Sequence, residues 1–177
     1  MSRFPLLVIV LGLFVTGCGS DDAVIPPTTA GPPTRVVFTA TLSPAQENPP
    51  IANADQTGSG TVTATMNMTR DSAGNITAAT IDFVATMSGF PPGTTLTLAH
   101  IHPGALGVNG PALINTTIAA GDVPMPNGSG TLNKPGINVT PVDTANQLLN
   151  NPSGYYFNIH TSLNPGGVAR GQLARTQ

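Results

Sequence analysis

All three histidines of the chain lie in two short segments whose spacing is suited to metal binding. His100 and His102 stand two residues apart in Ala-His-Ile-His, and His160 ends the segment Tyr-Tyr-Phe-Asn-Ile-His. On a strand, residues two apart point to the same side, roughly 6.5 Å from each other. Three imidazoles that converge at Zn–N distances of about 2.0–2.1 Å form a site with an open fourth position. One hypothesis is therefore a mononuclear Zn or Cu site.

The alternation of apolar and polar residues predicts which side of the sheet these groups share. If Ile101 and Ile159 face the core, the histidines and Asn158 face away from it, because successive strand residues point to opposite sides. Beyond the following Pro-Gly-Gly turn, the same alternation places Arg170 and Gln172 on that outer face. Neighbouring strands lie about 4.8 Å apart, so we expect a single polar cluster.

The same residues also fit a second hypothesis, a structural or partner-binding network without metal. In it the imidazoles, Glu47, Arg170 and backbone groups satisfy one another beneath a loop. Ser43–Thr57 is the candidate covering loop, and it carries Glu47. By strand alternation, Leu96 and Leu98 point to the same side as His100 and His102. A β-bulge or a covering loop is therefore needed at these leucines.

Period-two alternation runs through most of the chain after residue 34 and predicts an antiparallel β-sandwich. One short helix is expected, with Thr140 as N-cap, Pro141 at its first position, Asp143 in the first turn, and an end near Asn150. Long loops are expected at 43–57 and 121–127. About eight strands are expected, at 35–42, 61–69, 76–87, 95–102, 111–118, 130–132, 155–161 and 168–175.

The composition excludes several classes of function. Only 8% of the 177 residues are charged, with six Lys and Arg, so no basic patch for nucleic acid is expected. The one cysteine excludes a disulfide within the chain. The sequence contains no Gly-x-Ser-x-Gly motif. An enzyme is therefore less expected than a binding protein.

The first 34 residues are typical of an exported lipoprotein. Residues 1–17 combine Arg3 with an apolar run too short to span a bilayer, which indicates a signal peptide. Val15-Thr16-Gly17-Cys18 resembles a bacterial lipobox, which implies lipidation of Cys18. Residues 18–34 read as the lipidated cysteine and a Pro-rich tether, and 35–177 as the folded domain. We expect a membrane anchor through this lipid, at the outer membrane, in the periplasm or at the cell surface.

Several short motifs lie in order along the folded domain. They are Phe38–Leu42, Gln46–Pro50, Gly58–Gly60, Ala99–His102, Asn109–Pro111, Tyr156–Thr161, Asn164–Gly167 and Arg170–Leu173. Together they resemble the CHRD domain, which repeats in chordin and occurs singly in bacterial secreted proteins. The resemblance implies an immunoglobulin-like or dismutase-like Greek-key β-sandwich of largely unknown molecular function. The three histidines are too few for the dinuclear site of copper/zinc superoxide dismutase, but not for one metal.

Together these features predict an exported, lipid-anchored domain with a non-enzymatic binding or structural role toward a protein or surface ligand. The alternative is a mononuclear Zn or Cu protein that uses the three histidines, with a redox role. Elsewhere the sequence indicates no cofactor.

Overall fold

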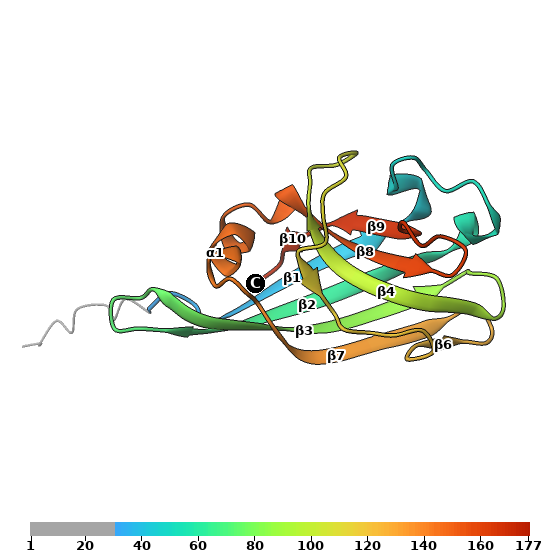
Figure 1. Cartoon of the computed structure of the whole chain (residues 1–177). Coiled ribbons are helices and arrows are strands. Elements are labelled where there is room, and N and C mark those ends of the chain that lie inside the picture. Colours follow the sequence, from blue (N-terminus) through green and yellow to red (C-terminus); the bar gives the residue numbers. More distant parts are fainter. Residues whose placement is uncertain (1–30) are drawn as a thin grey trace, which may run out of the picture. The chain divides into compact units, whose positions relative to one another are not determined.

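Two antiparallel five-stranded sheets face each other in the computed structural model, which describes residues 31–177 (Figure 1). The predicted signal peptide, Cys18 and most of the tether lie outside the described residues. The first sheet has the order β10 (Ala174–Arg175), β1 (Arg35–Leu42), β2 (Ser59–Arg70), β3 (Ile76–Ser88) and β7 (Gly130–Asn138). The second has the order β5 (Ile114–Asn115), β4 (Thr94–Pro103), β8 (Tyr155–Thr161) and β9 (Ala169–Gln172), with β6 (Pro124–Met125) also paired to β4.

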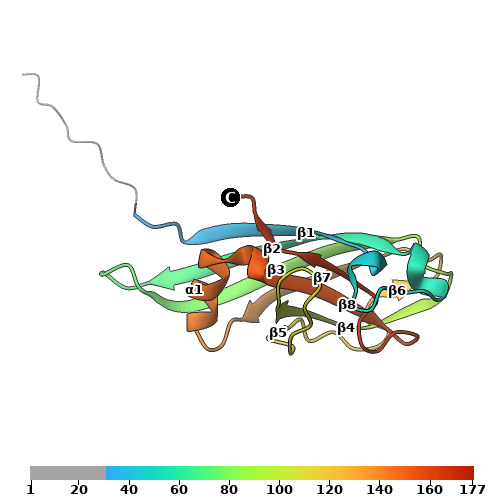
Figure 2. The ribbon, with the colours of Figure 1, turned by 90° about the horizontal axis from the view of Figure 1, so that it is seen from above.

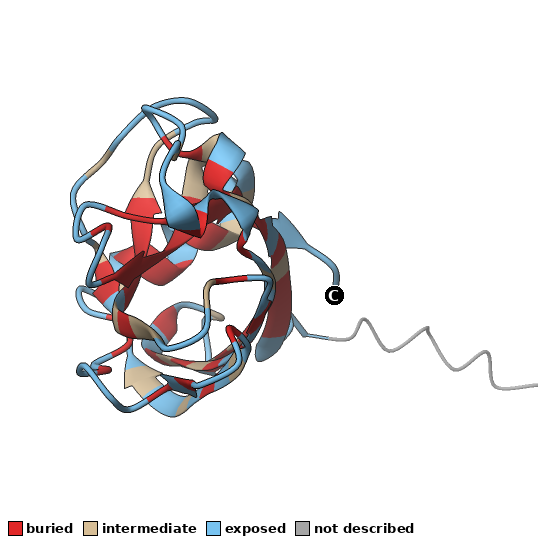
Figure 3. Ribbon diagram, turned by 90° about the vertical axis from the view of Figure 1, so that its right-hand side faces the viewer, coloured by how far each residue is buried: buried red, intermediate tan, exposed pale blue. Residues whose placement is uncertain are grey.

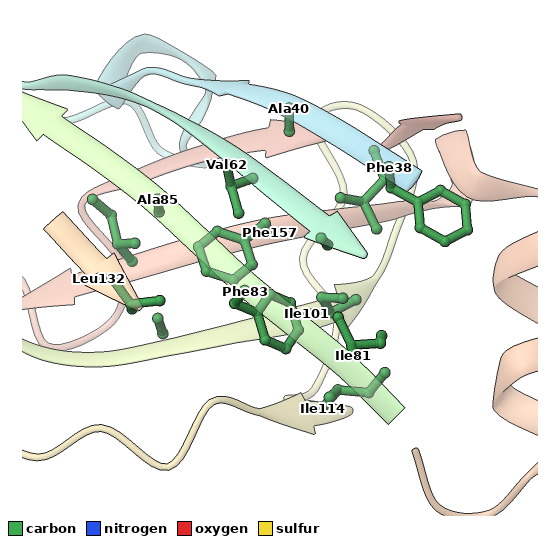
Figure 4. Close-up of a cluster of buried hydrophobic side chains, with 14 of the residues drawn as sticks. Phe38, Ala40, Val62, Ile81, Phe83, Ala85, Ile101, Ile114, Leu132 and Phe157 are labelled. Atoms are coloured by element: carbon green, nitrogen blue, oxygen red, sulfur yellow. The ribbon is translucent and has the colours of Figure 1, made fainter. Parts of the chain in front are cut away.

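The core lies between the two sheets and is filled by the alternate residues that the period-two pattern predicts. Buried and exposed positions alternate along the strands (Figure 3). Phe38, Val62 and Phe83 reach inward from the first sheet, and Ile101 and Phe157 from the second (Figure 4). The rings of Phe83 and Phe157 meet at 5.5 Å between centroids, which joins the two layers. The predicted β-sandwich is confirmed.

Strand boundaries differ from the expectation where the chain runs along sheet edges. The expected strand 111–118 pairs only over β5, because Thr117 adopts a left-handed backbone with φ of 58° that ends the ladder. β7 extends well beyond the expected 130–132 through Pro135, since a proline is tolerated on an edge strand. A register shift accommodates this extension, and Gly136 donates its N–H to Asp82 at 2.7 Å. The expected strand 168–175 divides into β9 and β10, and β6 was not expected.

The predicted α-helix is present but begins later than expected. α1 spans Asp143–Asn150, and Val142 is its N-cap, with no side-chain cap hydrogen bond. Thr140 is therefore not the cap and Pro141 is not in the first turn, whereas Asp143 is. Ala145 and Leu148 bury the inner face of the helix. Among residues 31–177, no helix combines the length and apolar character needed to cross a membrane.

Three short 3-10 helices lie in the connections, η1 (Pro44–Gln46), η2 (Ala54–Thr57) and η3 (Pro152–Gly154). Seen from above, α1 lies toward one end of the sheets and the segment with η1 and η2 toward the other (Figure 2). The expected loop 43–57 is thus ordered. Its first residue forms an isolated bridge with Arg170, which holds the segment against β9.

Candidate metal centre

The outer face of the second sheet carries the polar residues that parity predicts. His100 pairs with Asn158, and Asn158 pairs with Arg170, so these three form one row across β4, β8 and β9. A parallel row contains His102, Tyr156 and Gln172. The intervening isoleucines, Ile101 and Ile159, are fully buried on the opposite side. The predicted common face therefore exists.

A β-bulge resolves the parity conflict at the start of β4. The register with β8 shifts between Leu96 and Leu98, so that Leu96 pairs with Thr161 and Leu98 with His160. Leu96 is fully buried in the core, whereas Leu98 is 38% exposed on the face that carries the histidines. Of the two features expected at this point, a bulge or a covering loop, the bulge is confirmed.

The three imidazoles converge. One nitrogen from each of His100, His102 and His160 lies within 4.8 Å of the others, and all three residues are buried. The closest pair is His100 Nδ1 and His160 Nε2, at 3.2 Å. The ring of His100 stands edge-on to both others, at 84° to His102 and 76° to His160. The 3.2 Å contact shows that the nitrogen-bearing edges of His100 and His160 meet.

Backbone carbonyls determine which nitrogens carry electron pairs. His102 Nδ1 donates to the Gly110 carbonyl at 3.0 Å, and His160 Nδ1 donates to the Pro165 carbonyl at 2.9 Å. Because a carbonyl only accepts, both Nδ1 atoms carry the proton and both Nε2 atoms keep a lone pair. The buried Nε2 of His102 has no hydrogen-bond partner. A hydrogen bond from the other ring nitrogen to a backbone carbonyl, as in His102 and His160, is typical of metal-binding histidines.

All three imidazoles are neutral at physiological pH. Burial, together with smaller effects of the neighbouring His160 and His102, lowers the pKa of His100 to about 4. Burial also lowers the pKa of His102, with smaller opposing and reinforcing effects from the Gly110 carbonyl and from His160. The pKa of His160 is lowered by burial, against the Pro165 carbonyl. Neutral imidazoles can bind a metal without first losing a proton.

Tyr156 and Gly110 hold the ring of His102. Tyr156 stacks on His102 at 4.9 Å between centroids and 4° between planes. Its hydroxyl accepts from the Gly110 N–H at 3.2 Å, and the carbonyl of Gly110 accepts from His102. Gly110 needs to be glycine, since a Cβ there would collide with the carbonyl of Pro103.

Arg170 ties two loops to the sheet beside this centre. It is 1% exposed, and its Nε donates to the Gln46 carbonyl at 2.6 Å. Its Nη1 donates to Asn109 Oδ1 at 2.8 Å and to the Val108 carbonyl at 3.4 Å. The predicted partner Glu47 lies at 3.9 Å from Nε, so an ion pair exists but is longer than these hydrogen bonds. The guanidinium also lies 4.7 Å from the centre of the Tyr156 ring.

The remaining predicted polar residues surround the histidines without bonding to them. Gln172 donates to the carbonyls of Gly104 and Ser153, at 2.9 and 2.7 Å. Burial raises the pKa of Glu47 to about 7, although the charge of Arg170 opposes the rise. Three buried polar atoms here have no partner, namely Glu47 Oε1, Asn158 Oδ1 and Arg170 Nη2. Arg170 contacts Gln46, so the segment 43–57 covers Arg170. His102 contacts Gly110, so the 104–110 loop covers His102.

Sequence reasoning missed three contributors to the site: Tyr156, Asn109 and the carbonyl of Gly110. The parity argument contained the signal for Tyr156, because it lies two residues before Asn158 and four before His160. Asn109 and Gly110 gave no such signal, because they belong to a loop with no period. Their roles depend on where the loop returns to the sheet.

Comparison with family models gives a match over residues 38–173 to the family described as CHRD domain. The matched range begins inside β1 and ends after β9, and it contains every residue of the site. The comparisons with curated proteins and with solved structures gave no match.

Proposed function

The chain belongs to the CHRD domain family, and we propose that its sandwich binds one transition-metal ion through His100, His102 and His160. One observation carries this proposal: three neutral ring nitrogens lie within 4.8 Å of one another on a buried face. Imidazole nitrogen suits zinc, copper, iron and nickel, so the choice lies among these metals.

The distances require only small side-chain movements. Two nitrogens bound at about 2.0–2.1 Å to one tetrahedral ion stand roughly 3.3 Å apart. His100 Nδ1 and His160 Nε2 are already 3.2 Å apart. His102 Nε2 has no hydrogen-bond partner to give up, whereas the Nδ1 bond to the Gly110 carbonyl must adjust if the ring moves toward the pair.

Binding also requires a change of tautomer at His100 alone. His160 Nε2 can only accept, because its Nδ1 proton is donated to Pro165. His100 Nδ1 must therefore donate across the 3.2 Å contact when no ion is bound. If His100 instead carries its proton on Nε2, all three converging nitrogens offer lone pairs.

The test is the metal content of the full chain purified without chelators, followed by titration with Zn(II) and Cu(II). We expect one ion per chain, and His102→Ala should abolish tight binding while circular dichroism remains unchanged. Thr63→Ala, on the first sheet, serves as the matched control and should bind like the natural chain. If the natural chain and His102→Ala bind metal equally, the three-histidine site is refuted and a metal-free polar network remains.

We propose further that the domain is exported and anchored to a membrane by lipid on Cys18, with a binding role and not a catalytic one. The support is the lipobox-like sequence before Cys18 and the Pro-rich residues that follow it. A labelled fatty acid should be incorporated into the natural chain, which should sediment with membranes. Cys18→Ser should lose both properties, and label in that variant would refute lipidation at this residue.

A further inference from the structure

The metal-binding cluster contains no anionic ligand. Among the residues described, 31–177, neither a carboxylate nor a thiolate joins the three imidazoles. Neutral ligands leave the full charge of the ion uncompensated. The cost of burying an uncompensated charge is high, and in a continuum solvent it rises with the square of the charge. The buried cluster therefore disfavours a divalent ion more than a monovalent one.

The nearest fixed charge adds to this discrimination. Arg170 is fully buried on the same face, and its charge lowers the pKa of His102. The ring of Tyr156 contacts both, at 4.7 Å from the guanidinium and 4.9 Å from the His102 ring. Glu47 lies beside Arg170 at 3.9 Å and is not part of the histidine cluster. The positive charge thus repels a bound cation, and a divalent ion more strongly.

The number of ligands points the same way. Zinc held by three histidines needs a water as its fourth ligand, and divalent copper favours a square or tetragonal arrangement. Here the protein supplies three nitrogens whose rings stand nearly perpendicular in two of the three pairs. Monovalent copper and zinc both have a filled d shell and no geometric preference from it, but monovalent copper is stable with three ligands and needs no fourth.

Resting on the proposed function, we infer that the site binds monovalent copper in preference to divalent copper or zinc. Such a preference stabilises the reduced ion. Each tenfold difference in affinity between Cu(I) and Cu(II) raises the Cu(II)/Cu(I) potential by about 59 mV. The ligand class is therefore a soft, singly charged cation. No bond to a further protein group is required.

The experiment compares affinities of the full chain for the three ions by competition. Cu(I) is titrated anaerobically against a chromophoric Cu(I) chelator, and Cu(II) and Zn(II) against chelators of known affinity. We expect Cu(I) to bind at least about tenfold more tightly, as one unit of charge difference supports. Equal or tighter binding of Cu(II) or Zn(II) overturns this inference but leaves the proposed metal site intact. If the chain binds none of the three ions, both this inference and the proposed metal site are refuted.

A charge variant tests the electrostatic cause directly. Leu98 lies opposite His160 on the same face and is 38% exposed, so it accepts a polar side chain. Leu98→Glu should shift the ratio of affinities toward the divalent ions by about tenfold. Leu98→Gln, of the same shape without the charge, should leave the ratio unchanged. If both variants shift the ratio equally, or neither does, charge is not the basis of the preference.

Discussion

Arg170 should be the residue outside the histidines whose loss most weakens the domain. Its guanidinium joins β9 to the segment 43–57 through the Gln46 carbonyl and to the 104–110 loop through Asn109. Arg170→Ala removes these contacts together and leaves Glu47 buried without a cation. Both loops should then be held less tightly against the sheet, including the loop that supports His102.

The magnitude follows from the contacts. The two short hydrogen bonds, at 2.6 and 2.8 Å, come from a charged donor and contribute about 1.5–3 kcal/mol each. The contact with the face of Tyr156 adds about 1 kcal/mol. Part of this loss in free energy is offset, because Arg170→Ala also removes the cost of burying the guanidinium away from water. We expect the free energy of unfolding to fall by about 4 kcal/mol, within the range for breaking a buried ion pair.

Urea denaturation of the full chain, followed by circular dichroism, measures this loss. Arg170→Lys is the matched variant, because it keeps the charge but cannot reach both loops with one planar group, so its loss should be intermediate. A further check is the pKa of Glu47, which should rise in Arg170→Ala because Arg170 lowers it in the natural chain. If the free energy of unfolding falls by less than about 1 kcal/mol, as for an exposed ion pair, Arg170 does not hold the two loops to the sheet.

Three other substitutions test separate parts of the site. The pKa of Glu47 is raised from 4.5 to about 7, so its contribution to folding is full below pH 4.5 and is lost as pH rises through 7. Glu47→Gln should therefore gain stability relative to the natural chain by up to about 3 kcal/mol between pH 4.5 and 8, and a constant difference would contradict the raised pKa. Tyr156→Phe keeps the stack but loses the hydroxyl that accepts from Gly110, which should cost about 1 kcal/mol of unfolding free energy in urea. Gly110→Ala should weaken metal binding in titration because its Cβ collides with Pro103, whereas Gly166→Ala, with open space around it, should not; equal affinities would refute the role of the Gly110 carbonyl.

The histidines change the stability of the domain with pH in the opposite direction to Glu47. The test therefore compares the free energies of unfolding of the natural chain and of Glu47→Gln at each pH. Burial lowers the pKa of His100 to about 4 from 6.5. Its contribution to stability is full above pH 6.5 and is lost as pH falls through 4. The natural chain should therefore lose stability at both ends of this range, and the Glu47→Gln difference isolates the carboxyl.

Much of the site could be predicted from the sequence because strand alternation is a local property. Parity alone placed His100, His102, Asn158 and His160 on one face, and it required a bulge or a covering loop near Leu98, where the structure shows a bulge. The strand ends were less predictable. The strand expected at 130–132 extends as β7 through Pro135, because a proline is tolerated at the edge of a sheet. Likewise, the expected cap at Thr140 did not form.

The sequence alone determined the sandwich, the side of the sheet on which the polar groups lie, and the composition without a basic patch. These depend on residue type and on a period of two, which hold along a few consecutive residues. The tertiary structure decided how close the imidazole nitrogens come and which of them carry protons. Those features depend on the carbonyls of Gly110 and Pro165, which reach the rings only when the loops return to the sheet.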